Sequence, residues 1–159
     1  MVSQIVPVTA GEIRRNKFNN NSFERRIGIN TDDFTFSNEG CALTVTPPEI
    51  ALNSHRIVHG GWTAALFDTV ATGAAYTYQT GGLADNEYGL TAALDIKFDS
   101  PVLPGRTYTC KGGIIGREGN NIHTQATVID SEGKQVANAK ALVKARRPDY
   151  PKQAAWAFY

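Results

Sequence analysis

The fold of this chain is decided by the stretch LNSHRIVHGGWTAALFDTVATGAAYTY, residues 52–78. From position 60 to 78 it contains no proline, and its apolar residues lie on more than one side of a helical projection. A helix that is apolar nearly all round is usually buried. The sequence therefore predicts one long buried helix over residues 60–78, ended by Gly81 and Gly82.

Strand patterns lie on both sides of this helix. Six segments are predicted as strands: 27–36, 41–46, 88–98, 106–115, 122–130 and 136–145. In 88–98 the residues Leu90, Ala92, Leu94, Ile96 and Phe98 share one face. The last segment presents small side chains on one face, which would let a helix approach closely: Ala137, Ala139, Ala141, Val143 and Ala145.

This order of elements predicts an α+β fold, in which an antiparallel sheet of five to six strands wraps around one long central helix. With 159 residues there is room for one such domain, which we place at 27–145. Residues 1–26 are expected to form a tail and a short helix, and 146–159 a second tail. A short sheet has exposed edges that a second copy would cover, so a dimer or a dimer of dimers is expected.

Composition narrows the classes of function. Apolar residues make up 42% and charged residues 19%, which is typical of a globular protein. The net charge of +1 disfavours nucleic acid as a partner, and no segment is suited to a membrane span or a secretory signal. Cys41 and Cys110 are far apart in strand-like segments, which favours free thiols in a reducing cytoplasm. The cysteines and three histidines form no metal-ligand motif.

Two features of the predicted helix suggest chemistry. Asp68 is the only charged residue between His59 and Asp85, and we expect it to be buried, where a carboxylate needs a partner or a function. Gly60 and Gly61 open the helix, where free backbone amides suit a carbonyl oxygen that becomes an oxyanion. The structural alternatives are an Asp bonded to a nearby hydroxyl or amide, and an ordinary tight helix start.

The spacing of these two features has a consequence. Gly60 and Asp68 are eight residues apart, or about 12 Å along one helix. Asp68 therefore cannot reach a carbonyl group held at the start of its own helix. If both act on one substrate, they come from two chains, and the active site lies at a dimer interface.

The same stretch resembles the active-site segment of hotdog-fold acyl-CoA thioesterases, in particular the PaaI-like family named for the phenylacetate pathway. The pattern has Asn, then His-Gly-Gly six residues on, then Asp nine after the His, and it falls here on Asn53, His59, Gly60, Gly61 and Asp68. Residues 94–105 and 133–145 also resemble that family, so that the likeness covers roughly 27–145.

The resemblance implies a hotdog fold and a role for each matched residue. Asp68 would be the general base or nucleophile, and the Gly60 amide would polarise the thioester carbonyl. Asn53 would hold the water or the carbonyl. Thr91 occupies the place of a Ser or Thr that bonds the Asp or the water in some members.

Substrate contacts are also expected. His59 and Gly61 lie beside the substrate in this interpretation, although His59 is better suited to setting the helix start. The acyl group would lie between two subunits, lined by Trp62, Leu66, Phe67 and Tyr76. Coenzyme A phosphates need cations, for which we rank Arg117 first among six candidates, the others being Arg106, Lys111, Lys144, Arg146 and Arg147.

The sequence therefore predicts hydrolysis of acyl-CoA or aryl-CoA thioesters without a metal or other cofactor. Two alternative hypotheses about the function stay open. One is a non-catalytic acyl-CoA binding protein. The other is a hotdog thioesterase or dehydratase acting on an acyl chain bound to a carrier protein, the dehydratase chemistry pairing His59 with Asp68.

Overall fold

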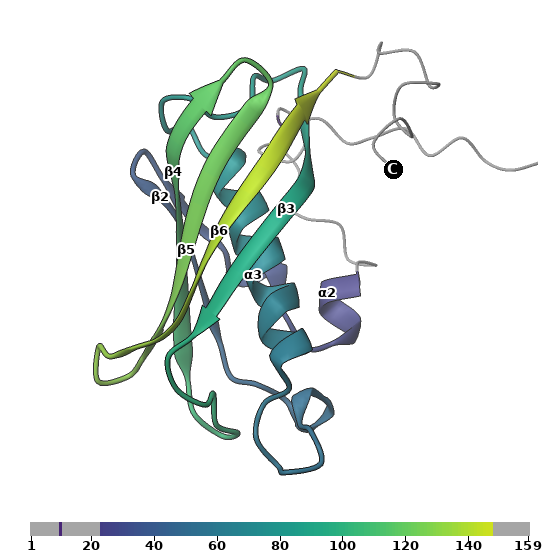
Figure 1. Ribbon diagram of the computed structural model, residues 1–159, viewed down its shortest axis with the longest axis vertical. Coiled ribbons are helices and arrows are strands. Elements are labelled where there is room, and N and C mark those ends of the chain that lie inside the picture. Colours follow the sequence, from purple (N-terminus) through teal and green to yellow (C-terminus); the bar gives the residue numbers. More distant parts are fainter. Residues whose placement is uncertain (1–9, 11–22, 148–159) are drawn as a thin grey trace, which may run out of the picture.

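The computed structural model describes Ala10 and residues 23–147. Of the tail and short helix expected over 1–26, only Ala10 and residues 23–26 are described, and of the tail expected over 146–159 only Arg146, the last residue of the final strand, and Arg147. The described end of the first segment is a one-turn helix, α2 (Phe23–Arg26), which packs beside the long helix (Figure 1).

The sheet has six strands, and every neighbouring pair in it is antiparallel. The strands are β1 (Thr35–Ser37), β2 (Gly40–Val45), β3 (Tyr88–Phe98), β4 (Tyr108–Glu118), β5 (Asn121–Asp130) and β6 (Gln135–Arg146). Their spatial order is β1-β2-β4-β5-β6-β3, so β3 crosses over to form the edge beside β6. This leaves β1 and β3 as the two edges.

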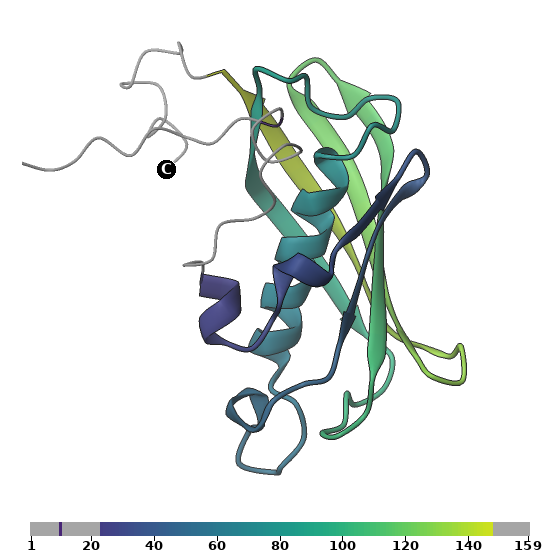
Figure 2. The ribbon, with the colours of Figure 1, turned by 180° about the vertical axis from the view of Figure 1, so that it is seen from behind.

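One long helix, α3 (Gly60–Ala75), lies against one face of this sheet, as Figures 1 and 2 show from opposite sides. The small residues of β6 are buried on that face, as the sequence predicted. On β4, a side chain at Gly112 would come within 2.8 Å of the carbonyl oxygen of Val70 in α3. The expected sheet around one helix is confirmed, and small residues are what permit the close contact.

The described helices include none that is long and apolar enough to cross a lipid bilayer.

Three elements differ from prediction by more than one residue, and one of them is β4, which was expected over 106–115 and spans Tyr108–Glu118. The expected strand 27–36 is wrong except at its end, because Thr31–Asp33 forms a 3-10 helix that the Asn30 side chain caps by accepting from the Asp32 amide. The long helix ends at Ala75 instead of 78, well before Gly81. There the Thr77 hydroxyl and amide both bond the Ala74 carbonyl, which closes the last turn early.

The single apolar face expected for 88–98 is also wrong. A register shift between Thr91 and Ala93 interrupts the alternation in β3. Leu90 lies opposite Lys144, whereas Phe98 lies opposite the buried Ala137, which places the two on different faces. As part of an edge strand, Leu90 and Phe98 are 45% and 51% exposed.

Candidate active site

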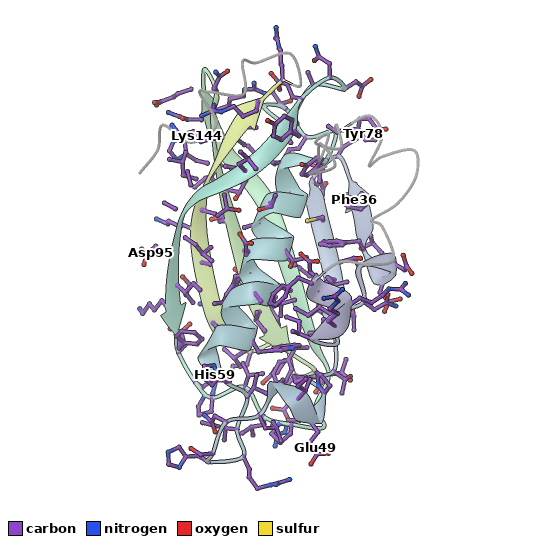
Figure 3. All side chains as sticks on the ribbon, turned by 90° about the vertical axis from the view of Figure 1, so that its right-hand side faces the viewer. Phe36, Glu49, His59, Tyr78, Asp95 and Lys144 are labelled. Atoms are coloured by element: carbon purple, nitrogen blue, oxygen red, sulfur yellow. The ribbon has the colours of Figure 1, made fainter. Side chains whose placement is uncertain are left out.

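The first turn of α3 leaves one backbone donor open. His59 is the residue that caps it, and its Nδ1 accepts from the Gly61 amide at 2.8 Å. The His59 carbonyl accepts from the amides of Trp62 and Thr63. The Gly60 amide has no hydrogen-bond partner among the described residues, and it lies at the positive end of the helix dipole. Figure 3 shows His59 at this end of the helix.

Asn53 lies in the loop that leads into the helix. Its Oδ1 accepts from the amides of His55 (2.9 Å) and Ile57 (3.3 Å), which holds a tight turn with Arg56 at a positive φ of 59°. These bonds use the side-chain oxygen. The Nδ2 group has no partner within the described chain and is left as a donor.

Gly60 and Asn53 meet at a cleft of about 430 Å³. Its other lining residues are mostly apolar or small: Ile57, Val58, Thr63, Phe98, Asp99, Ser100, Pro101 and Val102. Once a substrate excludes water from such a cleft, hydrogen bonds to a developing negative charge become stronger. The structure thus brings two predicted site residues together at the start of α3.

Asp68 is exposed, so the expectation that it is buried is wrong. The sheet covers the other sides of α3 and leaves one stripe of small and polar residues more accessible: Gly61, Ala64, Ala65, Asp68 and Thr72. Alanine and glycine are among the residues most often fully buried, so the helical projection did not show that this side is open.

Asp68 has a hydroxyl partner on the neighbouring edge strand. Thr91 Oγ1 lies 2.6 Å from Asp68 Oδ1, and Thr72 Oγ1 lies 2.8 Å from Thr91 Oγ1. The structure therefore brings Asp68 and Thr91 together, as expected from the position of Thr91. Thr72 was missed, although its spacing of four residues from Asp68 places it on the same side of the helix.

Trp62 and Phe67 do not line the open side. Trp62 is 7% exposed and donates from Nε1 to the Ile27 carbonyl at 2.8 Å, and Phe67 is fully buried. Leu66 and Tyr76 are buried as well. These four large side chains point into the core, because the sheet supplies the apolar surface that they cover. In the described chain these side chains therefore do not lie on the accessible side of α3, and the expected acyl lining stays a prediction.

Arg117 lies beyond the other end of α3. Its guanidinium donates to the carbonyls of Gly119 (2.8 Å) and Gly82 (2.7 Å) and pairs with Glu87 at 3.2 Å. The Glu87 side chain is only 6% exposed, so this cation neutralises a buried carboxylate. Within the described chain Arg117 already has these three partners, and its expected role as a phosphate ligand stays a prediction.

Over Ala10 and residues 23–147, no three His, Cys, Asp or Glu side chains are grouped so that they could hold a metal ion. Cys41 and Cys110 are free thiols, both buried.

Comparison with known families identifies the class of protein. The family model described as the thioesterase superfamily matches residues 55–137, just over half of the chain. The chain therefore belongs to the thioesterase superfamily. The matched region contains Gly60, Asp68 and Thr91 and begins two residues after Asn53. No curated protein matches the chain.

Solved structures agree on the fold. AziG of S. sahachiroi is 19% identical, with a TM-score of 0.70 over 79% of this chain and 97% of that one. The PaaI protein of the E. coli phenylacetic acid degradation operon is 22% identical, with a TM-score of 0.63 over 76% and 86%. A hypothetical thioesterase of Streptococcus pneumoniae TIGR4, solved with coenzyme A, is 16% identical, with a TM-score of 0.63 over 71% and 86%. At these identities the likeness concerns the fold, and the hotdog fold is confirmed.

Proposed function

We propose that this protein hydrolyses acyl-CoA or aryl-CoA thioesters to the free acid and coenzyme A. One observation carries the proposal: the unpaired Gly60 amide lines an apolar cleft with Asn53, on the same helix that exposes Asp68 bonded to Thr91. The coenzyme A bound by the pneumococcal thioesterase of the same fold supports a coenzyme A ester as the substrate.

The chemistry follows from the charges that develop. The Gly60 amide donates to the thioester carbonyl oxygen, whose negative charge grows as the carbonyl carbon becomes tetrahedral. Asn53 Nδ2 is a second donor at the same cleft. Asp68 takes a proton from water as the water oxygen attacks the carbonyl carbon, or it attacks that carbon itself and forms a mixed anhydride that water hydrolyses after the thiolate has left. The C–S bond then breaks, and the sulfur leaves as coenzyme A thiolate and takes up a proton.

The proposed site needs two protomers. Within one chain, Gly60 and Asp68 are separated by about 12 Å of helix, too far for one thioester group. The accessible stripe on α3 and the exposed edge of β3 lie next to each other, joined by the Thr91–Asp68 bond. A second copy covering this surface would bring its Asp68 to the cleft at Gly60.

The test is release of free thiol from a panel of aliphatic and aromatic acyl-CoAs by wild type and by Asp68→Asn. We expect wild-type turnover on at least one ester and a loss of about a hundredfold or more in the variant, because the amide neither accepts a proton nor attacks. Asp95→Asn is the matched control, since that carboxylate on β3 points away from α3 (Figure 3). We expect Asp95→Asn to retain wild-type activity.

Two results would contradict the proposal. Tight binding of acyl-CoA without turnover would favour a non-catalytic binding protein. Turnover only of an acyl chain presented on a carrier protein would keep thioester hydrolysis and exclude the free coenzyme A ester as the substrate.

A further inference from the structure

The hydroxyl group of Thr72 is bonded differently from that of Thr69 in the same helix. Threonines in helices commonly donate to a carbonyl one turn back. Thr69 does so, to the Ala65 carbonyl at 2.8 Å, and Thr77 just past the helix end donates to Ala74 at 2.7 Å. Thr72 instead reaches across to β3 and contacts Thr91 Oγ1 at 2.8 Å.

The chemistry of the groups fixes the direction of these bonds. An ionised carboxylate only accepts hydrogen bonds, so the Thr91 hydroxyl donates its single hydrogen to Asp68 Oδ1. Thr91 has no second hydrogen, and therefore Thr72 must be the donor in the Thr72–Thr91 contact. The three side chains form an ordered chain in which Thr72 donates to Thr91 and Thr91 donates to Asp68.

We propose that Thr72 is a positioning residue for the thioester hydrolysis proposed above, on which this inference rests. By donating to Thr91, Thr72 holds the Thr91 hydroxyl in the orientation that donates to Oδ1 of Asp68. When a hydroxyl group accepts a hydrogen bond, its O–H bond becomes more polar, and the hydrogen bond that the same hydroxyl donates becomes stronger. Asp68 is thereby held with Oδ1 engaged, and Oδ2, which has no partner in the described chain, is left for the water or the thioester.

Thr72 does not need to touch the substrate in this arrangement. It acts on the rate of the chemical step through the orientation of a carboxylate, and not on the affinity for the ester. A residue of this kind changes kcat and leaves KM nearly unchanged.

The experiment compares Thr72→Val with Thr69→Val in the acyl-CoA thiol-release assay. Both changes replace a hydroxyl by a methyl group at nearly constant volume, at positions three residues apart on α3. We expect Thr72→Val to lower kcat about three- to tenfold with KM within about twofold of wild type, the effect of one neutral hydrogen bond. Thr69→Val is expected to keep wild-type kcat, and Thr72→Ser to restore most of it. The thermal unfolding midpoints show whether all variants are folded.

A second comparison separates positioning from a structural effect. Thr91→Val removes the group through which Thr72 acts, so adding Thr72→Val to Thr91→Val should cause no further loss of kcat. Independent losses in the double variant, or equal losses in Thr72→Val and Thr69→Val, would overturn the inference. Wild-type kcat in Thr72→Val would also overturn it while leaving the proposed function intact. An inactive wild type would overturn the proposed function and this inference together.

Discussion

At the scale of single residues, the candidate site depends on which polar atoms lack a partner. The His59 ring accepts a hydrogen bond from the Gly61 amide, whereas the Gly60 amide has no partner among the described residues. The Asn53 side-chain oxygen accepts a hydrogen bond within its loop, and its side-chain nitrogen has no partner in the described chain. Helix ends expose backbone amides by necessity, so the sequence was sufficient to point to Gly60. It also favoured His59 as the residue that sets the helix start, and the structure shows the His59 ring capping the neighbouring Gly61 amide.

The two thiols give a prediction at this scale. Burial raises the pKa of the Cys41 thiol from 9.0 to about 12, although the backbone of Gly112 partly offsets the effect. Burial also raises the pKa of Cys110. A cysteine that ionises more easily when unfolded favours the unfolded state at high pH. The contribution of Cys41 to stability is therefore complete below pH 9.0 and is lost as the pH rises toward 12.

The measurement is denaturant unfolding of wild type and Cys41→Ala at several pH values from 8 upward. The difference in unfolding free energy between the two proteins should be constant up to about pH 9 and then shrink. A difference that stays constant through pH 11 would show that Cys41 ionises equally easily in both states.

At the scale of elements, strands were easier to predict than the open side of the helix. The sequence placed β3 at its observed bounds and β5 and β6 within one residue, because turns rich in Gly, Asn and Ser separate them. It failed at 27–36, where Asn30 starts a 3-10 helix. It also missed the register shift in β3, which leaves no local signal and depends on pairing with β6.

The contact between α3 and β4 gives a prediction at this scale. Gly112→Ala would place a methyl group 2.8 Å from the Val70 carbonyl oxygen and 2.9 Å from its Cγ1, so helix and strand would have to separate. We expect a loss of about 1–3 kcal/mol in unfolding free energy. Gly116→Ala on the same strand is the control, because no atom lies within 4 Å of the added carbon. Equal losses in the two variants would show that strand flexibility, and not packing, is what matters.

At the scale of the whole molecule, the proposed site takes Asn53 and Gly60 from one protomer and Asp68 from the other. The prediction is a complementation experiment that mixes two variants, Asp68→Asn and Asn53→Ala, each of low activity alone. If each site takes Asn53 from one protomer and Asp68 from the other, half of the dimers formed at random are mixed, and each of these has one intact site. Co-refolding of the two variants in equal amounts should therefore restore about one quarter of the activity of the same total amount of wild-type protein.

Sedimentation velocity on the same mixture would verify that dimers or larger assemblies form. Activity that stays at the level of the separate variants, in a mixture shown to exchange subunits, would place Asn53 and Asp68 of a site on one chain.

The sequence by itself determined the order of the long helix and of strands β2 to β6, the family resemblance at 53–68, and the distance between Gly60 and Asp68 on one helix. These are local properties, because turn residues, alternation and the helical rise act over a few positions. Tertiary structure decided which side of α3 stays accessible to solvent, which large side chains are buried in the core, and that Arg117 forms an ion pair with Glu87. Those outcomes depend on which surfaces the sheet covers and on contacts between residues far apart in sequence, so no local pattern encodes them.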